Sequence, residues 1–157
     1  MKLEGCREIA GSPHEVWEAM LTEDMLCACI PGCERLERSG DNRFDAEVVI
    51  KVGPVRARFA GTVALGDLDP PRSCRIEGEG NGGAAGFAQG HALINLEPGA
   101  SGTNLRYVAD IKIGGRIAAL GDRLFRGVVE RNITSFFDVF EARMTANPKI
   151  ESSTGRM

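Results

Sequence analysis

Three cysteines in one short stretch of the chain could ligate a metal. Cys27, Cys29 and Cys33 have the spacings C-x-C and C-x-x-x-C. Thiolates bind zinc and iron–sulfur clusters, but such sites usually need four ligands in recognisable pairs, and neither histidine of the chain is near them in sequence. We therefore interpret the three as small buried thiols beside the Pro31–Gly32 turn, and we predict no metal site.

A second candidate is the glycine-rich stretch from 78 to 90, which contains a literal G-x-G-x-x-G at Gly78, Gly80 and Gly83. In dinucleotide-binding proteins this pattern leads from a strand into the N-terminus of a helix, where backbone N–H groups receive the pyrophosphate. Here the flanking residues alternate as two strands do, and no helical pattern follows. The glycines therefore indicate a bulged or sharply bent sheet rather than a nucleotide site.

Side chains suited to general acid–base or nucleophilic catalysis are few. The two histidines, His14 and His91, are predicted in the first turn of a helix and on the outer face of a strand. The sequence has no G-x-S-x-G elbow and no H-E-x-x-H pair. Glu77 and Glu79 alternate outward in a strand, which is more typical of a solvated face than of an acid pair. We predict no catalytic residue and no required cofactor.

Composition excludes several classes of function. The 157 residues carry 19 Lys and Arg against 22 Asp and Glu, and a formal net charge of -3 gives no field to hold a polyanion, so nucleic acid is not expected as a partner. No run approaches the roughly 20 apolar residues needed to cross a bilayer, and the N-terminus has no apolar signal segment. Five cysteines suit a reducing compartment, and we expect a cytoplasmic protein.

The hydrophobic period changes along the chain and so defines the elements. Residues 2–9 alternate as a strand, and a capping box from Ser12 to Glu15 then starts the first of two short helices. From there to about residue 113 the period is two, which predicts about six consecutive antiparallel strands. After Gly114–Gly115 the period becomes helical for about thirty residues, with one broad apolar side.

This order of elements predicts an α+β fold with one long helix. A curved antiparallel sheet of about seven strands would wrap around the C-terminal helix, and two short helices would follow the first strand. We expect a single domain over residues 1–147. The polar residues 148–157 are expected to form a flexible C-terminal tail.

The predicted inner face of the sheet is poor in bulk. Small residues recur there among larger ones: Ala46, Ala57, Gly61, Gly86, Ala88, Gly90, Ala92 and Ala109. A void of about 300 Å³ under such residues would cost roughly 7 kcal/mol, comparable with a net stability of about 5 to 15 kcal/mol. A mostly apolar small molecule would relieve that cost, whereas tight collapse of the sheet is the alternative. The predicted cavity lining is Phe44, Phe59, Val63, Tyr107, Ile111, Leu120, Leu124 and Val128.

Several motifs, taken in their order and spacing, resemble one family. They are Cys29-Ile30-Pro31-Gly32-Cys33-Glu34, Val52-Gly53-Pro54-Val55, Gly86-Phe87-Ala88, Gly102-Thr103, and Gly114-Gly115 with Leu120-Gly121-Asp122-Arg123. Over about residues 1–142 the chain is similar to the carbon monoxide dehydrogenase G-subunit (CoxG-like) family, within the START/polyketide-cyclase-like (SRPBCC) helix-grip superfamily. The resemblance implies a seven-stranded sheet that grips the C-terminal helix around a pocket for a hydrophobic ligand.

The resemblance also implies a function. It suggests a non-catalytic accessory protein of a molybdenum hydroxylase of the carbon monoxide dehydrogenase type, acting in maturation, membrane recruitment or handling of a lipophilic electron carrier. The bound molecule is expected to be a quinone or a lipid. Some family members carry a C-terminal hydrophobic extension that is not found in this sequence, so we expect at most peripheral contact with the inner face of the membrane. The sequence leaves a homodimer open.

Two alternatives stay open on the same fold. One is a cyclase- or dehydratase-like enzyme in which Tyr107 or Glu77 projects into the pocket. The other is a structural partner with a closed core that binds the hydroxylase through its surface. A buried polar pair inside the pocket would favour the enzyme, and a core without a chamber would favour the structural partner.

Overall fold

The computed structural model describes residues 1–146, which form one curved sheet of seven antiparallel strands with helices on its concave side and at its ends. The predicted tail over 148–157 lies outside the described residues. The strands are β1 (Lys2–Ile9), β2 (Cys33–Gly40), β3 (Arg43–Val52), β4 (Val55–Asp69), β5 (Ser73–Asn81), β6 (Phe87–Pro98) and β7 (Thr103–Gly114). The helices are α1 (Pro13–Met20), α2 (Glu23–Cys29), α3 (Arg116–Ala119) and α4 (Asp122–Ala146), with a 3-10 turn, η1 (Gly83–Ala85).

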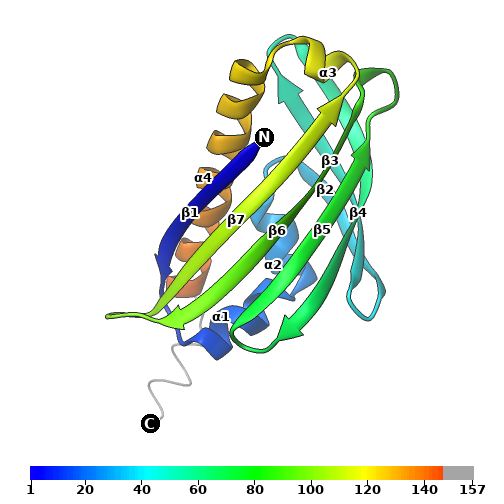
Figure 1. Ribbon diagram of the computed structural model, residues 1–157. Helices are drawn as coiled ribbons and strands as arrows, with labels where there is room; N and C mark the ends of the chain where they lie inside the picture. Colours follow the sequence, from blue (N-terminus) through cyan, green and yellow to red (C-terminus); the bar gives the residue numbers. More distant parts are fainter. Residues whose placement is uncertain (147–157) are drawn as a thin grey trace.

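The strand order in the sheet is β1-β7-β6-β5-β4-β3-β2. Each strand from β2 to β6 pairs with the next one along the chain, and β1 pairs with β7 at the far edge of the sheet. Figure 1 shows α4 running along the concave side of this sheet beside β1, with α1 and α2 at the lower end and α3 at the upper end. The predicted helix-grip architecture, including the two short helices after the first strand, is confirmed.

The first helix begins where the sequence predicts. The Ser12 hydroxyl accepts a hydrogen bond from the Glu15 N–H at 3.2 Å, and the Glu15 carboxylate accepts one from the Ser12 N–H at 2.9 Å. Together with Pro13 at the first helical position, this capping box satisfies N–H groups that would otherwise lack partners.

The long C-terminal helix is interrupted near its start. The sequence pattern predicts about thirty helical residues after Gly115, whereas the structure separates α3 from α4 at Gly121, whose φ is +99°. Glycine adopts this left-handed conformation without steric cost, and it commonly ends helices for that reason. The prediction of one unbroken helical segment was wrong at this point. None of the helices within residues 1–146 combines the length and the hydrophobicity needed to cross a membrane.

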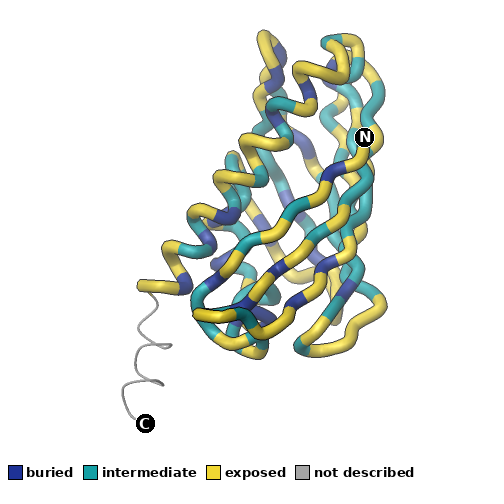
Figure 2. Tube along the Cα trace, turned by 60° about the vertical axis from the view of Figure 1, so that its left-hand side comes forward, coloured by how far each residue is buried: buried dark blue, intermediate teal, exposed yellow. Residues whose placement is uncertain are grey.

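Large buried side chains gather in three separate clusters on the concave side. The lower cluster joins α1, α2, the second half of α4 and the ends of β6 and β7, and it includes Trp17, Leu96, Leu105, Phe140 and Met144. The upper cluster joins the β3–β4 hairpin, α3 and the start of α4, and it includes Val52, Phe59, Ile117, Phe125 and Val128. The edge cluster is formed by Leu36, Phe44 and Ala46. Buried and exposed positions alternate along the strands and along α4 in Figure 2, as two-faced elements require.

Candidate functional site

A cavity of about 370 Å³ lies on the concave face, where the three clusters meet. Ile50 and Phe59 belong to or pack against the upper cluster, Ala46 belongs to the edge cluster, and Ile76 and Ala92 pack against the lower cluster. The inward-facing residues of its lining come from β3 to β7: Ala46, Val48, Ile50, Phe59, Gly61, Val63, Ile76, Gly78, Gly80, Ala88, Gly90, Ala92, Ala109 and Ile111. The sheet and the helix therefore do not collapse together in the middle of the described fold, and the closed-core alternative is not supported.

The floor of this cavity is almost bare backbone. Gly61 pairs with Gly80 across β4 and β5, and Gly78 pairs with Gly90 across β5 and β6. We call these four residues the glycine floor. Because none of them carries a side chain, the central strands present a smooth surface to the concave side, of the kind on which a flat molecule can lie.

The four floor glycines serve two different purposes. A Cβ atom at Gly61 would overlap the carbonyl oxygen of Glu79, and one at Gly90 would lie 2.6 Å from the carbonyl oxygen of Asp110. These two glycines let neighbouring backbones approach closely where the sheet curves. At Gly78 and Gly80, by contrast, a Cβ atom would meet nothing nearer than 3.8 Å. A Cβ atom would fit at these two positions without a clash, so their missing side chains widen the cavity instead.

The cavity offers few polar partners to water. The backbone groups of β4, β5 and β6 are paired in the sheet, and the inward side chains are apolar. Thr62, Glu79, Gln89 and His91 also border the cavity, but the alternation of the strands directs their side chains to the convex face. An ordered water needs two to four hydrogen-bonding partners, so the site suits an apolar molecule better than a water cluster.

The structure brings together only part of the predicted lining. Of the predicted residues, Phe59, Val63 and Ile111 lie in the lining of this cavity. The structure places the other five predicted residues outside that lining: Phe44, Tyr107, Leu120, Leu124 and Val128.

Three of those five residues, Leu120, Leu124 and Val128, follow α3 and lie at or beyond the break between α3 and α4. Val128 is buried in the upper cluster, and Leu120 packs beside it. Leu124 is 39% exposed and lies close to Gly53 in the β3–β4 hairpin. The break at Gly121 separates α3 from α4 and so changes which residues of this segment face the sheet. The first turns of α4 therefore pack at the upper end of the sheet and do not cover the glycine floor.

Phe44 and Tyr107 face inward but are used for packing. Phe44 is 1% exposed and forms the centre of the edge cluster. The Tyr107 ring stacks on Phe137 of α4 with ring centroids 5.7 Å apart, and its hydroxyl lies over Gly5, which has no side chain to oppose it. Burial raises the pKa of the Tyr107 phenol, so this residue stays protonated.

The residues suggested for an enzyme are not in the cavity. Tyr107 is packed against Phe137, and Glu77 is exposed on the convex face, where Arg75 donates to its carboxylate at 2.8 Å. No pair of polar side chains faces the cavity from the lining residues. The arrangement can bind an apolar molecule against the sheet, but it presents no acid–base pair to one.

Sequence reasoning missed three inward residues on β5, namely Ile76, Gly78 and Gly80. A signal for them was present. The strand alternates Ile76, Gly78, Gly80 against Glu77 and Glu79, and this period of two puts the glycines on the apolar face.

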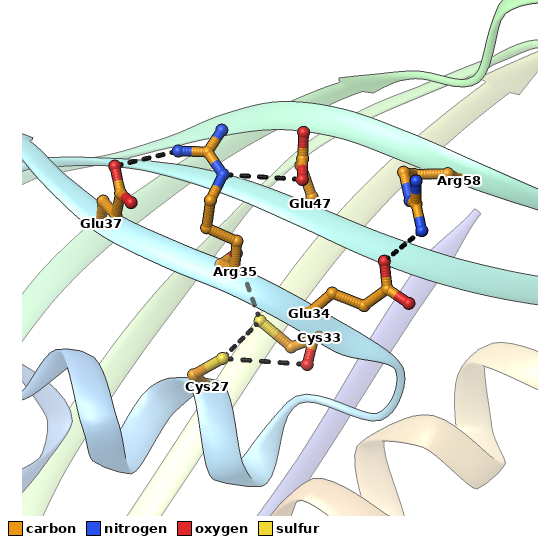
Figure 3. Close-up of polar contacts among 7 residues, drawn as sticks. All are labelled: Cys27, Cys33, Glu34, Arg35, Glu37, Glu47 and Arg58. Atoms are coloured by element: carbon orange, nitrogen blue, oxygen red, sulfur yellow. Dashed lines mark hydrogen bonds and ion pairs between the residues drawn. The ribbon is translucent and has the colours of Figure 1, made fainter.

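The cysteine-rich corner differs from its predicted description in one respect. Cys29 is buried, as predicted, but Cys27 and Cys33 are only half-buried. Their sulfur atoms lie 3.0 Å apart, with Cys27 on α2 and Cys33 at the start of β2 (Figure 3). Across residues 1–146, no group of three or more His, Cys, Asp and Glu side chains is arranged to hold a metal ion.

Comparison with known protein families shows which family this chain belongs to. The family model for the G-subunit of carbon monoxide dehydrogenase (CoxG) matches residues 5–145. The chain belongs to the CoxG family. The match spans nearly all of the segment in which the sequence motifs predicted this membership, and it includes every strand that lines the cavity. A search of curated proteins found no match to this CoxG-family chain.

Solved structures share the fold over almost the whole chain. A conserved protein from Geobacillus kaustophilus is 29% identical, with a TM-score of 0.86, and the alignment covers 92% of this chain and 95% of that one. A protein from Thermus thermophilus is 19% identical, with a TM-score of 0.68 and coverage of 93% and 98%. The ZhuI aromatase/cyclase from Streptomyces sp. R1128 is 15% identical, with a TM-score of 0.66 and coverage of 92% and 93%. At their lower identity, the last two establish the helix-grip fold alone.

Proposed function

We propose that this CoxG-family protein is a non-catalytic binding protein that holds a quinone-like or lipid-like molecule in the cavity. The observation that carries the proposal is the glycine floor between three packed clusters. The cavity of about 370 Å³ falls within the range of roughly 300 to 1,000 Å³ that is usual for small-molecule sites. Its lining is apolar and its floor carries no side chains, which suits a planar ring or a hydrocarbon chain.

The proposed lining includes both predicted and newly found residues. Phe59 lies at the upper side of the cavity, and a Cβ atom at Gly80 would be 3.8 Å from its ring. Val63 and Ile111 stand opposite Gly78 and Gly90 in the strand register. These three large side chains would contact the edges of a molecule that lies on the glycine floor.

The family supplies the proposed partner. Its description names a subunit of carbon monoxide dehydrogenase, and we infer that this chain serves a molybdenum hydroxylase of that type. A protein that binds an apolar molecule on this face of the sheet would be suited to carrying a quinone between such an enzyme and the membrane by peripheral contact. Maturation or recruitment of the hydroxylase falls within the same proposal, because each of these roles also needs an accessory protein rather than a second enzyme.

A cavity-filling variant tests the binding site. Purified full-length protein is titrated with decylubiquinone and, separately, with a short-chain phospholipid, and binding is followed by equilibrium dialysis and native mass spectrometry. We expect binding of at least one probe and a loss of at least tenfold in its affinity in Gly78→Leu, because the new side chain would occupy open space. Ala92→Leu fills the same cavity from β6 and should act in the same direction.

The matched control is Ala60→Leu, which adds the same three carbons as Ala92→Leu but on the exposed, convex face of β4. It should bind as the wild type does. Circular dichroism checks that all variants fold. If neither probe binds the folded wild type, or if both cavity variants bind normally, the proposed function is wrong.

The partner requires a separate measurement. The chain is co-expressed with a carbon monoxide dehydrogenase-type hydroxylase and purified through a tag on the hydroxylase. We expect the chain to be retained, and Gly78→Leu to be retained equally, because the substitution lies inside the grip. A chain that is never retained would contradict the partner while leaving the ligand site standing.

A further inference from the structure

Two thiols face each other at the junction of α2 and β2. The Cys27 and Cys33 sulfur atoms are 3.0 Å apart, and they point toward each other from the end of the helix and the start of the strand (Figure 3). The Cys33 thiol also lies 3.5 Å from the carbonyl oxygen of Arg35, to which it can donate. Both side chains are half-buried, so a small reagent can reach them.

We propose that Cys27 and Cys33 form a reversible dithiol–disulfide pair that is oxidised by low-molecular-weight disulfides. A disulfide bond is about 2.05 Å long, so the two sulfurs must approach by only about 1 Å. The other thiols on this part of the chain are poorly placed to compete. Cys29 is buried, and a residue two positions from Cys27 on a helix does not face it.

The chemistry is an ordinary thiol–disulfide exchange. The Cys27 thiol loses its proton, and its sulfur attacks one sulfur of the small disulfide and releases the first small thiolate, which leaves a mixed disulfide on Cys27. The Cys33 thiol then loses its proton, its sulfur attacks Cys27, and the second small thiolate leaves. The net reaction converts two protein thiols and one small disulfide into one protein disulfide and two small thiols.

The order of the two attacks follows from the environment of Cys33. Burial is the main cause that raises the pKa of the Cys33 thiol, to about 12, and the neighbouring Cys27 sulfur, whose thiolate would repel a second negative charge, acts in the same direction. Cys33 is therefore the poorer nucleophile toward a dissolved reagent. It becomes effective only when the mixed disulfide on Cys27 is held beside it.

The pair lies against the wall of the proposed cavity but does not depend on a ligand there. Cys27 and Cys33 pack on the edge cluster, and Cys33 stands opposite the lining residue Val48 in the β2–β3 register. Between the two cysteines, Gly32 adopts a φ of +78° and its carbonyl accepts a hydrogen bond from the Val49 N–H at 2.9 Å. A disulfide would fasten α2 to this strand pair.

The test uses the reduced full-length chain and glutathione disulfide. After incubation, free thiols are alkylated and the positions of links and adducts are found by mass spectrometric sequencing. We expect a Cys27–Cys33 link, a mass lower by two hydrogens, and full reversal by dithiothreitol. In Cys33→Ser the mixed disulfide on Cys27 should accumulate at least tenfold more than in the wild type, because the resolving thiol is gone.

Two controls make the result specific. Cys6→Ser removes an exposed thiol, and Cys29→Ala removes the buried neighbour on α2, and both variants should keep the link. Circular dichroism confirms that each variant is folded. The proposal is overturned if glutathione stays on Cys27 and Cys33 of the wild type without a link, or if Cys6 is modified while the pair does not react. It is also overturned if Cys33→Ser accumulates no more adduct than the wild type.

Discussion

The lower cluster and the glycine floor share one sheet face but are built in opposite ways. In the lower cluster, Leu96 of β6 and Leu105 of β7 pack together with Phe140 and Met144 of α4. All four side chains are no more than 2% exposed. A few residues along the same strands, the inward positions are Gly90 and Ala109, and the residues of α4 up to Ala146 contribute nothing to the lining of the cavity.

The clusters and the glycine floor therefore contribute to different properties of the protein, the clusters to stability and the floor to binding. Interdigitated large side chains in the clusters exclude water and hold the helix on the sheet, so removing one of them leaves a costly void. The glycine floor adds no such packing, and the space above it is left open. We therefore expect substitutions in the clusters to change the free energy of unfolding, and substitutions at Gly78 and Gly80 to change binding.

The largest expected effect is in the lower cluster. Phe140→Ala should lower the free energy of unfolding by about 3 to 5 kcal/mol, because it leaves a cavity where the ring is 1% exposed. Urea denaturation followed by circular dichroism measures the change. Phe87→Ala is the control, since its ring is 41% exposed and should cost less than about 1 kcal/mol. Equal losses in the two variants would contradict the assignment of stability to the cluster.

The next effect separates the two kinds of floor glycine. Gly61→Ala should lower the free energy of unfolding by about 1 to 3 kcal/mol or more, because the new methyl group overlaps the Glu79 backbone. Gly78→Ala should be neutral or stabilising by up to about 1 kcal/mol, since the nearest atom to its methyl group, the Thr62 carbonyl oxygen, is at an unstrained 3.8 Å. The same denaturation experiment compares them. A Gly78→Ala variant as unstable as Gly61→Ala would mean that the floor has no spare room.

A smaller effect is expected where β1 is held to α4. Arg7 donates to Asp138 at 2.8 Å and to Glu141 at 3.1 Å, and its guanidinium lies 5.5 Å from the Phe137 ring centroid. Both hydrogen-bonded carboxylates raise the pKa of Arg7, so it is charged at any ordinary pH. Arg7→Met keeps the aliphatic stem and should cost about 1 kcal/mol, and the cost should shrink in high salt. A loss that is independent of salt would assign Arg7 a packing role instead.

The smallest effect lies at the exposed turn between β6 and β7. The Ser101 hydroxyl and N–H both donate to the Glu8 carboxylate and lower the pKa of Glu8. The resulting stabilisation is fully present above the ordinary pKa of glutamate and is lost as pH falls through the lowered value. Ser101→Ala should move the Glu8 pKa upward, as measured by NMR titration of the side-chain carboxyl carbon. An unchanged pKa would show that the backbone N–H alone sets it.

Elements with a clear period could be predicted from the sequence. The capping box at Ser12, the strands that alternate from Arg43 to Gly114, and the apolar face of the long helix all reflect local chemistry. The order of these elements then limits the fold to a sheet gripping a helix. The shortage of bulky inward residues predicted a cavity, and the structure contains one.

The lining of the cavity depends on tertiary contacts, which the hydrophobic period of the sequence does not reveal. Leu124 has the right spacing on the helix, but the break at Gly121 turns it outward, toward the hairpin. Tyr107 has the right parity on β7, yet Gly5 and Phe137 give its ring a packed place. The approach of Cys27 to Cys33 depends on how the turn at Gly32 docks on β3, which is a tertiary contact. Such contacts are set by the assembled fold rather than by local sequence.

The central claim is that an apolar molecule rests on the glycine floor, and backbone amide NMR can observe this directly. Glycine amides fall in a sparsely populated part of the nitrogen–proton spectrum, so Gly61, Gly78, Gly80 and Gly90 can be followed while decylubiquinone is added to the full chain. We expect these four signals to shift together and saturably, whereas those of Gly40 and Gly127, which lie outside the lining, should stay in place. Stationary floor signals under conditions where the probe binds elsewhere on the protein would contradict it.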